Sequence, residues 1–405
     1  MPSPHQPPGL RLLHAAWGLP QREGFPLGVI ECYARKMSRN CFLVLLAGCV
    51  SDYEVVPEPV ELHPGDVTPC DFTRVENTAF WAYDCNPVFT TTDEAWAGTI
   101  GSTAFAVTEV VGHPFYQLWY AGLPSESIDG QYGLGYAVSP EGIGWEVHTA
   151  NPLLSEPPNS EAWDASNMDQ LVAVWDDRAA QYVILYQGYN LDPFINSWGL
   201  GVLTSEDGQR WSRLSPEPVF DLSMPVGDVS SWCWPLGLSL RSEGGYTGYI
   251  AGQTGQAMSL EDIKCEVYTL EAEDVSSWRP RPQRLLAAGS AGAWDDQGFG
   301  SLAVASLDGT DYLFYQGFGG WIQEDGGYIS SQNHFFGMAV GSGSGWEKQG
   351  PPIPLNNTTS GDIGSVAAHT VGDRIHLWIS DVYDGSQGVG YFLFDPTRAA
   401  EEDGQ

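Results

Sequence analysis

The chain has 405 residues, with 17 basic and 51 acidic side chains and a formal net charge of −34 at pH 7. Such an acidic surface repels nucleic acid and anionic lipid headgroups, so we exclude nucleic-acid binding and favour a neutral, polyhydroxylated or cationic ligand. The 48 glycines, 28 prolines and 12% aromatic residues suit many short strands with tight turns, and no long amphipathic helix is evident.

The N-terminal part of the chain differs from the rest. Residues 1–36 are proline-rich and carry no strand repeat, and we interpret them as a mis-called or disordered extension before Met37. In residues 37–49, Arg39 precedes a short apolar run that ends in Leu46–Cys49. This resembles a bacterial lipoprotein signal peptide, because the run is too short to span a bilayer and ends in small residues and cysteine. The alternative is a chance apolar segment.

The resemblance to a lipoprotein signal implies lipidation of Cys49 and export to the bacterial cell envelope, where we expect anchoring to the outer membrane. Residues 50–85 are predicted to be a tether, since residues 50–69 are rich in proline and acidic side chains and have little to bury. Residues 50–405 carry 12 of the basic and 49 of the acidic residues, a net charge of −37. The predicted mature chain is therefore even more acidic than the whole.

One pattern recurs five times after residue 86. Its second strand is an apolar and aromatic run, found at Tyr116–Gly122, Tyr182–Gly188, Tyr246–Gly252, Tyr312–Gly317 and Ile375–Asp381. The turn after the third strand ends in tryptophans spaced by 66, 67 and 68 residues, at Trp145, Trp211, Trp278 and Trp346. A period of this length suits one four-stranded antiparallel sheet per repeat.

The repeat predicts an all-β, five-bladed propeller with four-stranded blades over residues 86–395, followed by an acidic tail at 396–405. The fifth unit ends at Phe394 without a fourth strand, whereas residues 86–91 precede the first unit. We therefore expect the N-terminal segment to supply the outer strand of the last blade, which closes the ring and removes an open sheet edge. An open array of sheets and a two-domain sandwich are the alternatives.

The cysteines support export. Removing Cys32 and Cys41 with the signal, and assigning Cys49 to lipid, leaves four cysteines. An even number in an exported chain suggests two disulfides. We predict Cys233 with Cys265, which open the first and third strands of one blade, and Cys70 with Cys85, which are close in sequence. No CxxC or HExxH spacing occurs, so a zinc site is not expected.

Segments such as Leu118–Gly122 and Leu134–Val147 make the repeat similar to the five-bladed propeller glycosidase clans, which include arabinanases, β-xylosidases, invertases, levansucrases and mannoside phosphorylases. The turn before each repeated tryptophan also resembles the Asp-box of sialidases. In both settings the turn is structural, because its carboxylate caps backbone N–H groups and its tryptophan packs between blades. We therefore interpret Glu141, Asp207 and their tryptophans as structural.

The resemblance implies a site on the innermost strands near the axis. The first blade would supply the catalytic base, the second an aspartate that tunes the pKa of the acid, and the third the glutamate that acts as the acid. Aligned on tryptophan, the first inner strand offers Gly101 and Ser102, and the third offers no glutamate. Of the three expected site residues, only the second-blade aspartate has a counterpart in this sequence, Asp169. The acidic residues available for an axial cluster, each alternatively a turn cap, are Asp164, Asp169, Asp295, Asp296 and Asp362. We predict Asp169, Asp164 and Asp296 as catalytic.

Aromatic and amide side chains are predicted to complete a sugar site, since indole rings stack on the C–H faces of sugars. The alternative for the periodic tryptophans is packing between blades. Trp234 and Trp321 break the repeat, which favours them as ligand contacts. The predicted ligand-binding residues are Trp163, Trp234, Trp294, Trp321, Gln187 and Gln316.

Two functions remain open from the sequence. The first is a surface-anchored, glycoside hydrolase-like enzyme with a rearranged carboxylate pair. The second is a non-catalytic propeller that binds a glycan or a partner protein. We expect a carbohydrate ligand, a monomer and no cofactor, and nothing in the sequence supports a calcium site.

Overall fold

The structure, a computed structural model, describes residues 70–403 apart from 91–95, 111–112, 124–131, 156, 158, 191, 193–194, 196, 242–243, 255–263, 320, 324–328, 332–333, 343–344, 356–363 and 381–387. The predicted signal peptide, Cys49 and residues 50–69 lie outside this part of the chain. The described residues form β-strands and one helix, α1 (Pro396–Asp403), so the predicted all-β class is confirmed. No helix among them is long and apolar enough to cross a membrane.

Two antiparallel sheets contain the first two repeats. In each, the chain runs up and down through four strands in sequence order, and a further short strand pairs with the third. The first sheet consists of β4 (Thr99–Val110), β5 (His113–Leu123), β6 (Gly133–Ser139), β7 (Glu146–Val147) and β8 (Leu154–Ser155). The second consists of β9 (Asn167–Asp176), β10 (Gln181–Asn190), β11 (Ser197–Ser205), β12 (Ser212–Arg213) and β13 (Phe220–Asp221).

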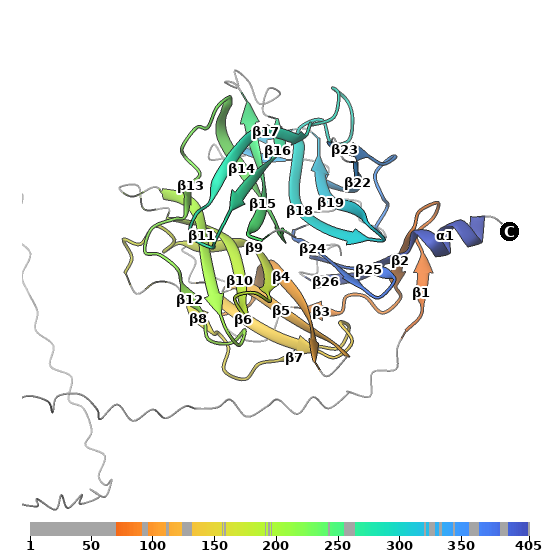
Figure 1. Ribbon diagram of the computed structural model, residues 1–405, viewed down its shortest axis with the longest axis horizontal. Coiled ribbons are helices and arrows are strands. Elements are labelled where there is room, and N and C mark those ends of the chain that lie inside the picture. The colour runs from red at the N-terminus through yellow and green to blue at the C-terminus, as the bar shows by residue number, and fades with distance from the viewer. Residues whose placement is uncertain are drawn as a thin grey trace, which may run out of the picture. The chain divides into compact units, whose positions relative to one another are not determined.

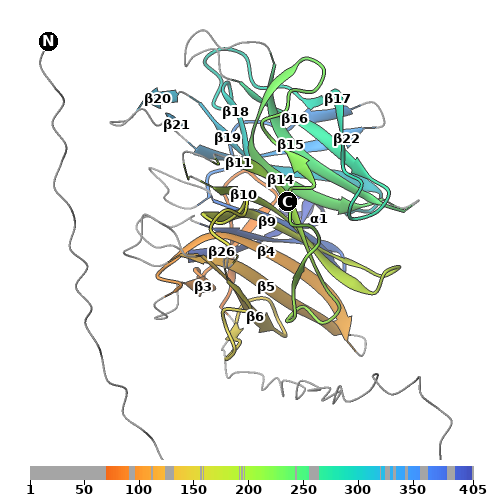
Figure 2. The ribbon, with the colours of Figure 1, turned by 90° about the vertical axis from the view of Figure 1, so that its left-hand side faces the viewer.

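The third and fourth repeats lie in one eight-stranded sheet. It consists of two antiparallel sets, which are joined by the single parallel pair Cys265–Gly298. The first set is β14 (Val229–Leu240), β15 (Tyr246–Thr254), β16 (Cys265–Ala272) and β17 (Arg279–Leu286). The second is β18 (Gly298–Leu307), β19 (Thr310–Phe318), β22 (His334–Ser342) and β23 (Gly345–Lys348). A separate hairpin, β20 (Trp321–Gln323) with β21 (Ile329–Ser331), follows β19 and projects from the other strands in Figure 2.

The last sheet joins both ends of the described chain, as the missing fourth strand of the fifth repeat led us to expect. β2 and β3 both pair with the last strand, β26, and β1 pairs with β2. The strands are β1 (Phe72–Arg74), β2 (Phe80–Tyr83), β3 (Phe89–Thr90), β24 (Val366–Val371), β25 (Arg374–Ser380) and β26 (Gly388–Phe394). The N-terminal segment thus contributes more strands to this sheet than predicted, because β1 and β2 lie in the segment assigned to the tether. At the other end of the chain, the segment assigned to an acidic tail contains the helix α1.

The first strands of the five repeats contact one another in a closed circuit. β4 contacts β9, β9 contacts β14, β14 contacts β18, β18 contacts β24, and β24 contacts β4. We call these five the inner strands. Figure 1 shows β4, β9 and β24 near the middle of the molecule. Outside the inner strands the core is apolar and aromatic, and its largest fully buried side chains are Trp81 on β2, Trp119 on β5 and Trp378 on β25.

The repeated turn is structural, as predicted. Gly142 and Gly208 adopt φ values of 78° and 76°, a left-handed conformation that glycine reaches without strain. The Gly208 carbonyl accepts hydrogen bonds from the indoles of Trp211, at 2.9 Å, and of Trp119 in the preceding sheet, at 2.8 Å. The carboxylate of Asp207 accepts the amides of Gln209 and Arg210 at 2.9 and 2.8 Å. Burial opposes ionisation, but these bonds lower the pKa of Asp207 to about 2.

Both predicted disulfides are present. Cys70 joins Cys85 with a Cα–Cα distance of 5.8 Å, and Cys233 joins Cys265 with a Cα–Cα distance of 6.0 Å. The first bridge closes the loop that carries β1 and β2. The second links Cys233, the fifth residue of the inner strand β14, to Cys265 at the start of β16 in the same antiparallel set.

Candidate functional site

Buried hydroxyl groups tie neighbouring inner strands together. The Ser102 hydroxyl accepts the Leu171 amide at 3.1 Å, and the Ser301 hydroxyl accepts the Val366 amide at 2.9 Å. Ser102 and Ser301 each lie at a register shift between the inner strand and its neighbour, where a β-bulge turns a side chain out of the regular ladder. In the alignment on the repeated tryptophan, Ser102 takes a position where a catalytic base was expected from the sequence. It makes a structural contact here, and a hydroxyl is far too weak an acid to replace a carboxylate.

Asp169 is the carboxyl group at the equivalent bulge of the second repeat. Its Oδ1 accepts the Gln170 amide at 2.7 Å, and Gln170 has a positive φ of 50° that marks the bulge. Burial raises the pKa of Asp169, while the hydrogen bonds of Gln170 and Ser102 partly offset this effect. The group is therefore a desolvated carboxyl, held at a defined position beside the axis, that takes up a proton more readily than an exposed aspartate.

Polar side chains extend from Asp169 across the same sheet. Gln187, which is buried, is the cross-strand partner of Asp169, and Tyr189 is the partner of Asn167. The Asn167 amide donates to the Tyr189 hydroxyl at 2.6 Å. Burial and the charge of Asp169 raise the pKa of Tyr189, which places its hydroxyl within electrostatic reach of that carboxyl. Cross-strand partners share one face of a sheet, so these four side chains form one polar row.

Asp164 has a different environment. Its Oδ2 accepts the Tyr186 hydroxyl at 2.8 Å and pairs with Arg213 Nε at 3.0 Å. Asp295 directly follows Trp294, as Asp164 follows Trp163, and it forms an ion pair with Lys348 at 2.5 Å. Both ion pairs tie the start of an inner strand to an outer strand. This geometry favours a structural role for Asp164 over the catalytic role predicted for it.

Asp296 also makes a local contact. Its Oδ2 accepts the Gly292 amide at 2.7 Å, within the turn that leads into β18. This hydrogen bond caps the turn, which was the alternative role considered for every axial aspartate. The catalytic prediction for Asp296 gains no support from it, and Asp362 lies outside the described residues.

The predicted aromatic contacts divide into two groups. Trp163 stacks on Tyr186 and Trp294 stacks on Tyr315, with ring centroids 5.8 and 5.6 Å apart respectively. Both indoles therefore serve in packing, which was the alternative to a ligand contact. The side chains of Trp234 and Trp321 lie outside the part of the chain that the structure describes. The side-chain amide nitrogen of Gln316 forms a hydrogen bond with His334 Nδ1 at 3.0 Å.

The sequence reasoning missed Tyr189 and Trp198. Trp198 is the cross-strand partner of Tyr189, and 39% of its surface is exposed. The signal was present, because two aromatic residues stand at the facing ends of the second and third strands of this repeat. Their pairing required the register of β10 and β11, which the spacing alone did not provide.

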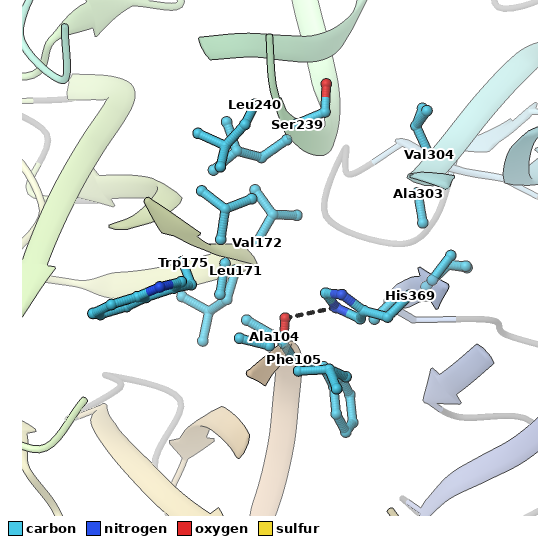
Figure 3. A pocket seen from close by; sticks show the side chains of 18 of the residues that line it. Ala104, Phe105, Leu171, Val172, Trp175, Ser239, Leu240, Ala303, Val304 and His369 are labelled. Carbon is cyan, nitrogen blue, oxygen red and sulfur yellow. Dashed lines mark hydrogen bonds between the residues drawn. The ribbon is translucent and has the colours of Figure 1, made fainter. Parts of the chain in front are cut away.

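A cavity of about 300 Å³ lies on the axis among the five inner strands. Figure 3 shows that small and aliphatic side chains line much of it, together with Phe105, Trp175 and Ser239, and that His369 reaches toward Phe105. His369 Nε2 lies 2.9 Å from the Phe105 carbonyl, and burial lowers the pKa of this histidine to about 4, which keeps it neutral. The cavity lies along the middle and later parts of the inner strands, whereas the ligand pocket was predicted where they begin. Within the described residues, no cluster of histidine, cysteine and acidic side chains is arranged to hold a metal ion.

Comparison with known proteins identifies a fold rather than a family. No family model and no curated protein sequence matches this chain. Among solved structures, the chain is similar to a glycosyl hydrolase from Bacteroides ovatus, with a TM-score of 0.55 and 16% identity over 82% of this chain and 95% of the other. It is also similar to a β-1,2-mannobiose phosphorylase from Listeria innocua in complex with β-1,2-mannobiose, with a TM-score of 0.55 and 13% identity over 80% and 98%. A third similar structure comes from the GH130 family of mannoside phosphorylases, described as containing hydrolases of β-1,2 mannosidic linkages in Candida mannan, with a TM-score of 0.55 and 16% identity over 82% and 95%. The chain therefore has a glycoside hydrolase-like fold.

Proposed function

We propose that this chain is a five-bladed propeller that binds a carbohydrate where its inner strands begin. The five-bladed reading is supported by the closed circuit of inner strands, by the five sequence repeats, and by the sheet shared between the two ends of the described chain. In this reading the eight-stranded sheet is two blades joined by one parallel bridge. The five inner strands then converge at the axis, which is where side chains from all five blades come together.

The observation that carries the carbohydrate proposal is the polar row on the second sheet. Asp169, Gln187, Asn167 and Tyr189 supply a carboxyl, two amides and a phenol hydroxyl on one face. This set matches the many hydroxyl groups of a sugar, each of which donates and accepts hydrogen bonds. Two of the named solved structures, the β-1,2-mannobiose phosphorylase and the GH130 protein, are described with mannosides, which are neutral polyhydroxylated molecules of the kind that the acidic surface of this chain favours.

Binding is better supported than hydrolysis. Hydrolysis needs two carboxyl groups that flank the bond. Among the described axial residues, Asp164 and Asp295 are committed to ion pairs, and Ser102 stands at the expected base position. One observation favours catalysis as a second candidate: burial raises the pKa of Asp169, as a general acid requires. Binding of a partner protein instead of a glycan is a further alternative.

We also propose that the protein is exported and lipid-anchored through Cys49 to the bacterial cell envelope, at the outer membrane, as a monomer. The two disulfides support an oxidising compartment. The signal-like segment at residues 37–49 supports the anchor. A tether that ends before β1 would hold the carbohydrate site away from the membrane surface.

Asp169→Asn tests the proposed site. Calorimetric titration of the wild type with mannose, β-1,2-mannobiose, β-1,2-mannotriose, and the xylose and arabinose oligomers of the same lengths should identify a ligand. The variant should bind that ligand at least 10-fold more weakly, because a hydrogen bond to a charged group contributes about 1.5–3 kcal/mol. Reducing-sugar release on the same panel separates hydrolysis from binding.

The control is Asp373→Asn, whose carboxylate is 88% exposed and should leave affinity unchanged. Because burial raises the folded-state pKa of Asp169 above its unfolded value, its ionisation opposes folding as the pH rises above the unfolded pKa. Asp169→Asn should therefore retain or increase stability at pH 7. A variant that unfolds, or one that binds sugar as the wild type does, would show that Asp169 is structural.

A further inference from the structure

The polar row on the second sheet continues outward to an exposed indole. Asn167 on β9, Tyr189 on β10 and Trp198 on β11 are successive cross-strand partners. Their side chains therefore lie on one face of the sheet, the face that also carries Asp169, which is two residues along β9 from Asn167. Trp198 is one of four large apolar side chains recorded as exposed among the described residues. Its place at the end of a polar row distinguishes it from a scattered surface residue.

The backbone of Trp198 is held on both sides. Its carbonyl accepts the Leu222 amide at 3.1 Å, and the preceding Ser197 hydroxyl donates to the Trp163 carbonyl at 2.9 Å. On the inner side, the Tyr189 carbonyl accepts the Ser166 amide at 3.0 Å. An aromatic side chain on a fixed backbone loses little conformational entropy when it binds a ligand, which suits it to act as a rigid platform.

We propose that Trp198 is a stacking platform for a sugar ring of a neutral oligosaccharide that extends from Asp169 outward over β9, β10 and β11. This rests on the proposed carbohydrate function and adds to it the length, direction and charge of the ligand. Neighbouring strands lie about 4.8 Å apart and each residue rises about 3.4 Å along a strand, so the two strand steps from β9 to β11 and the two-residue offset between Asp169 and Asn167 separate the backbone positions of Asp169 and Trp198 by about 12 Å. This distance corresponds to two sugar units along a chain. The ligand therefore needs about three units for one ring to lie at Asp169 and another on Trp198.

The charge of the chain restricts the sugar. Residues 50–405 carry a net charge of −37, and the central polar group of the row is itself an aspartate. Uronic-acid polymers would be repelled by the net negative charge of the chain and by the Asp169 carboxylate. Neutral pyranose chains meet none, and their C–H faces pack on the indole. The substrate class is thus a linear neutral oligosaccharide.

The experiment compares chain lengths. Wild type, Trp198→Ala, Trp198→Phe and Asp169→Asn are titrated calorimetrically with one-, two- and three-unit members of the β-1,2-mannose series and of the xylose and arabinose series, and with trigalacturonic acid. For the series that binds, Trp198→Ala should weaken the trisaccharide about 5–10-fold and leave the monosaccharide within 2-fold. Trp198→Phe, which keeps an aromatic ring, should restore most of the loss. Trigalacturonic acid should not bind.

The control is Leu240→Ala, because Leu240 is 37% exposed at the far end of the inner strand β14 and should not change any affinity. If Asp169→Asn weakens binding but Trp198→Ala leaves every length unchanged, or weakens the monosaccharide as much as the trisaccharide, the platform is wrong and the proposed function stands. If trigalacturonic acid binds as well as the neutral trimers, the neutral-ligand inference is wrong. If no sugar on the panel binds the wild type, both the proposed carbohydrate function and the proposed role of Trp198 are wrong.

Discussion

The ion pair between Asp164 and Arg213 is the feature whose removal has the most predictable cost. Asp164 is 2% exposed and Arg213 is 20% exposed, so both charges are largely removed from water. Arg213→Met would leave a buried carboxylate with the Tyr186 hydroxyl as its remaining hydrogen-bond donor to Oδ2. Breaking a buried pair by removing one partner costs about 3–5 kcal/mol. We expect this loss in the free energy of unfolding at pH 7.

The loss is large enough to measure thermally. The folded part of the chain has about 335 residues, for which the unfolding entropy is about 0.7 kcal/mol/K. A loss of 3–5 kcal/mol therefore lowers the melting temperature by about 4–7 °C. Urea unfolding followed by tryptophan fluorescence gives the free energy, and differential scanning calorimetry gives the melting temperature. Asp164→Asn/Arg213→Met should recover part of the loss, because the double variant leaves no buried charge.

Arg210→Met is the matched control in the same repeat. Arg210 pairs with Asp207 at 2.7 Å but is 72% exposed, and an exposed pair contributes about 0–1 kcal/mol. The melting temperature of this variant should fall by no more than about 1.5 °C. If Arg213→Met destabilises the protein no more than Arg210→Met does, the reasoning is refuted. Asp164 would then regain its place as a catalytic candidate.

Two further predictions concern the cysteines. Cys233→Ala/Cys265→Ala opens a loop of 32 residues and should lower the free energy of unfolding by about 4 kcal/mol in the chain-entropy model, measured by urea unfolding under non-reducing conditions; a loss below about 1 kcal/mol would argue that the bridge adds little. Cys49→Ser should move the protein from the membrane fraction to the soluble fraction of the cell envelope, and normal processing with full membrane retention would contradict lipidation at this residue.

Much of the strand order followed from local pattern. The second strand of each repeat was predicted at Tyr182–Gly188 and Tyr246–Gly252, for example, and the observed strands β10 and β15 contain these ranges. The expectation of two disulfides came from counting, because four cysteines remain after the predicted signal and lipidation residues are removed, and the pairing came from the positions of the cysteines. Short elements such as β1 and β2 escaped prediction, because three or four residues carry too little periodicity to stand apart from a tether.

The candidate site was less accessible. From sequence, Asp164 and Asp169 were both catalytic candidates near the start of one inner strand, and Asp169 was preferred because it lies inside the strand and matches the second-blade aspartate. In the structure the first carries an ion pair to Arg213, from 49 residues later in the chain, and the second lies at a bulge beside Ser102, from 67 residues earlier. Neither partner is visible in a local window. Trp198 was overlooked for the same reason, because its neighbour Tyr189 is set by strand register.

The sequence by itself determined the all-β class, the repeating unit and the two disulfides, because each depends on periodicity or on the number of residues of one type. Only the tertiary structure decided which carboxyl groups are neutralised, which is desolvated, and which aromatic ring remains exposed. These properties depend on the charges and surfaces that surround a side chain, and folding brings those together from distant parts of the chain. A repeat can predict where each strand lies, but only the register between strands and the packing between sheets decides what each side chain meets.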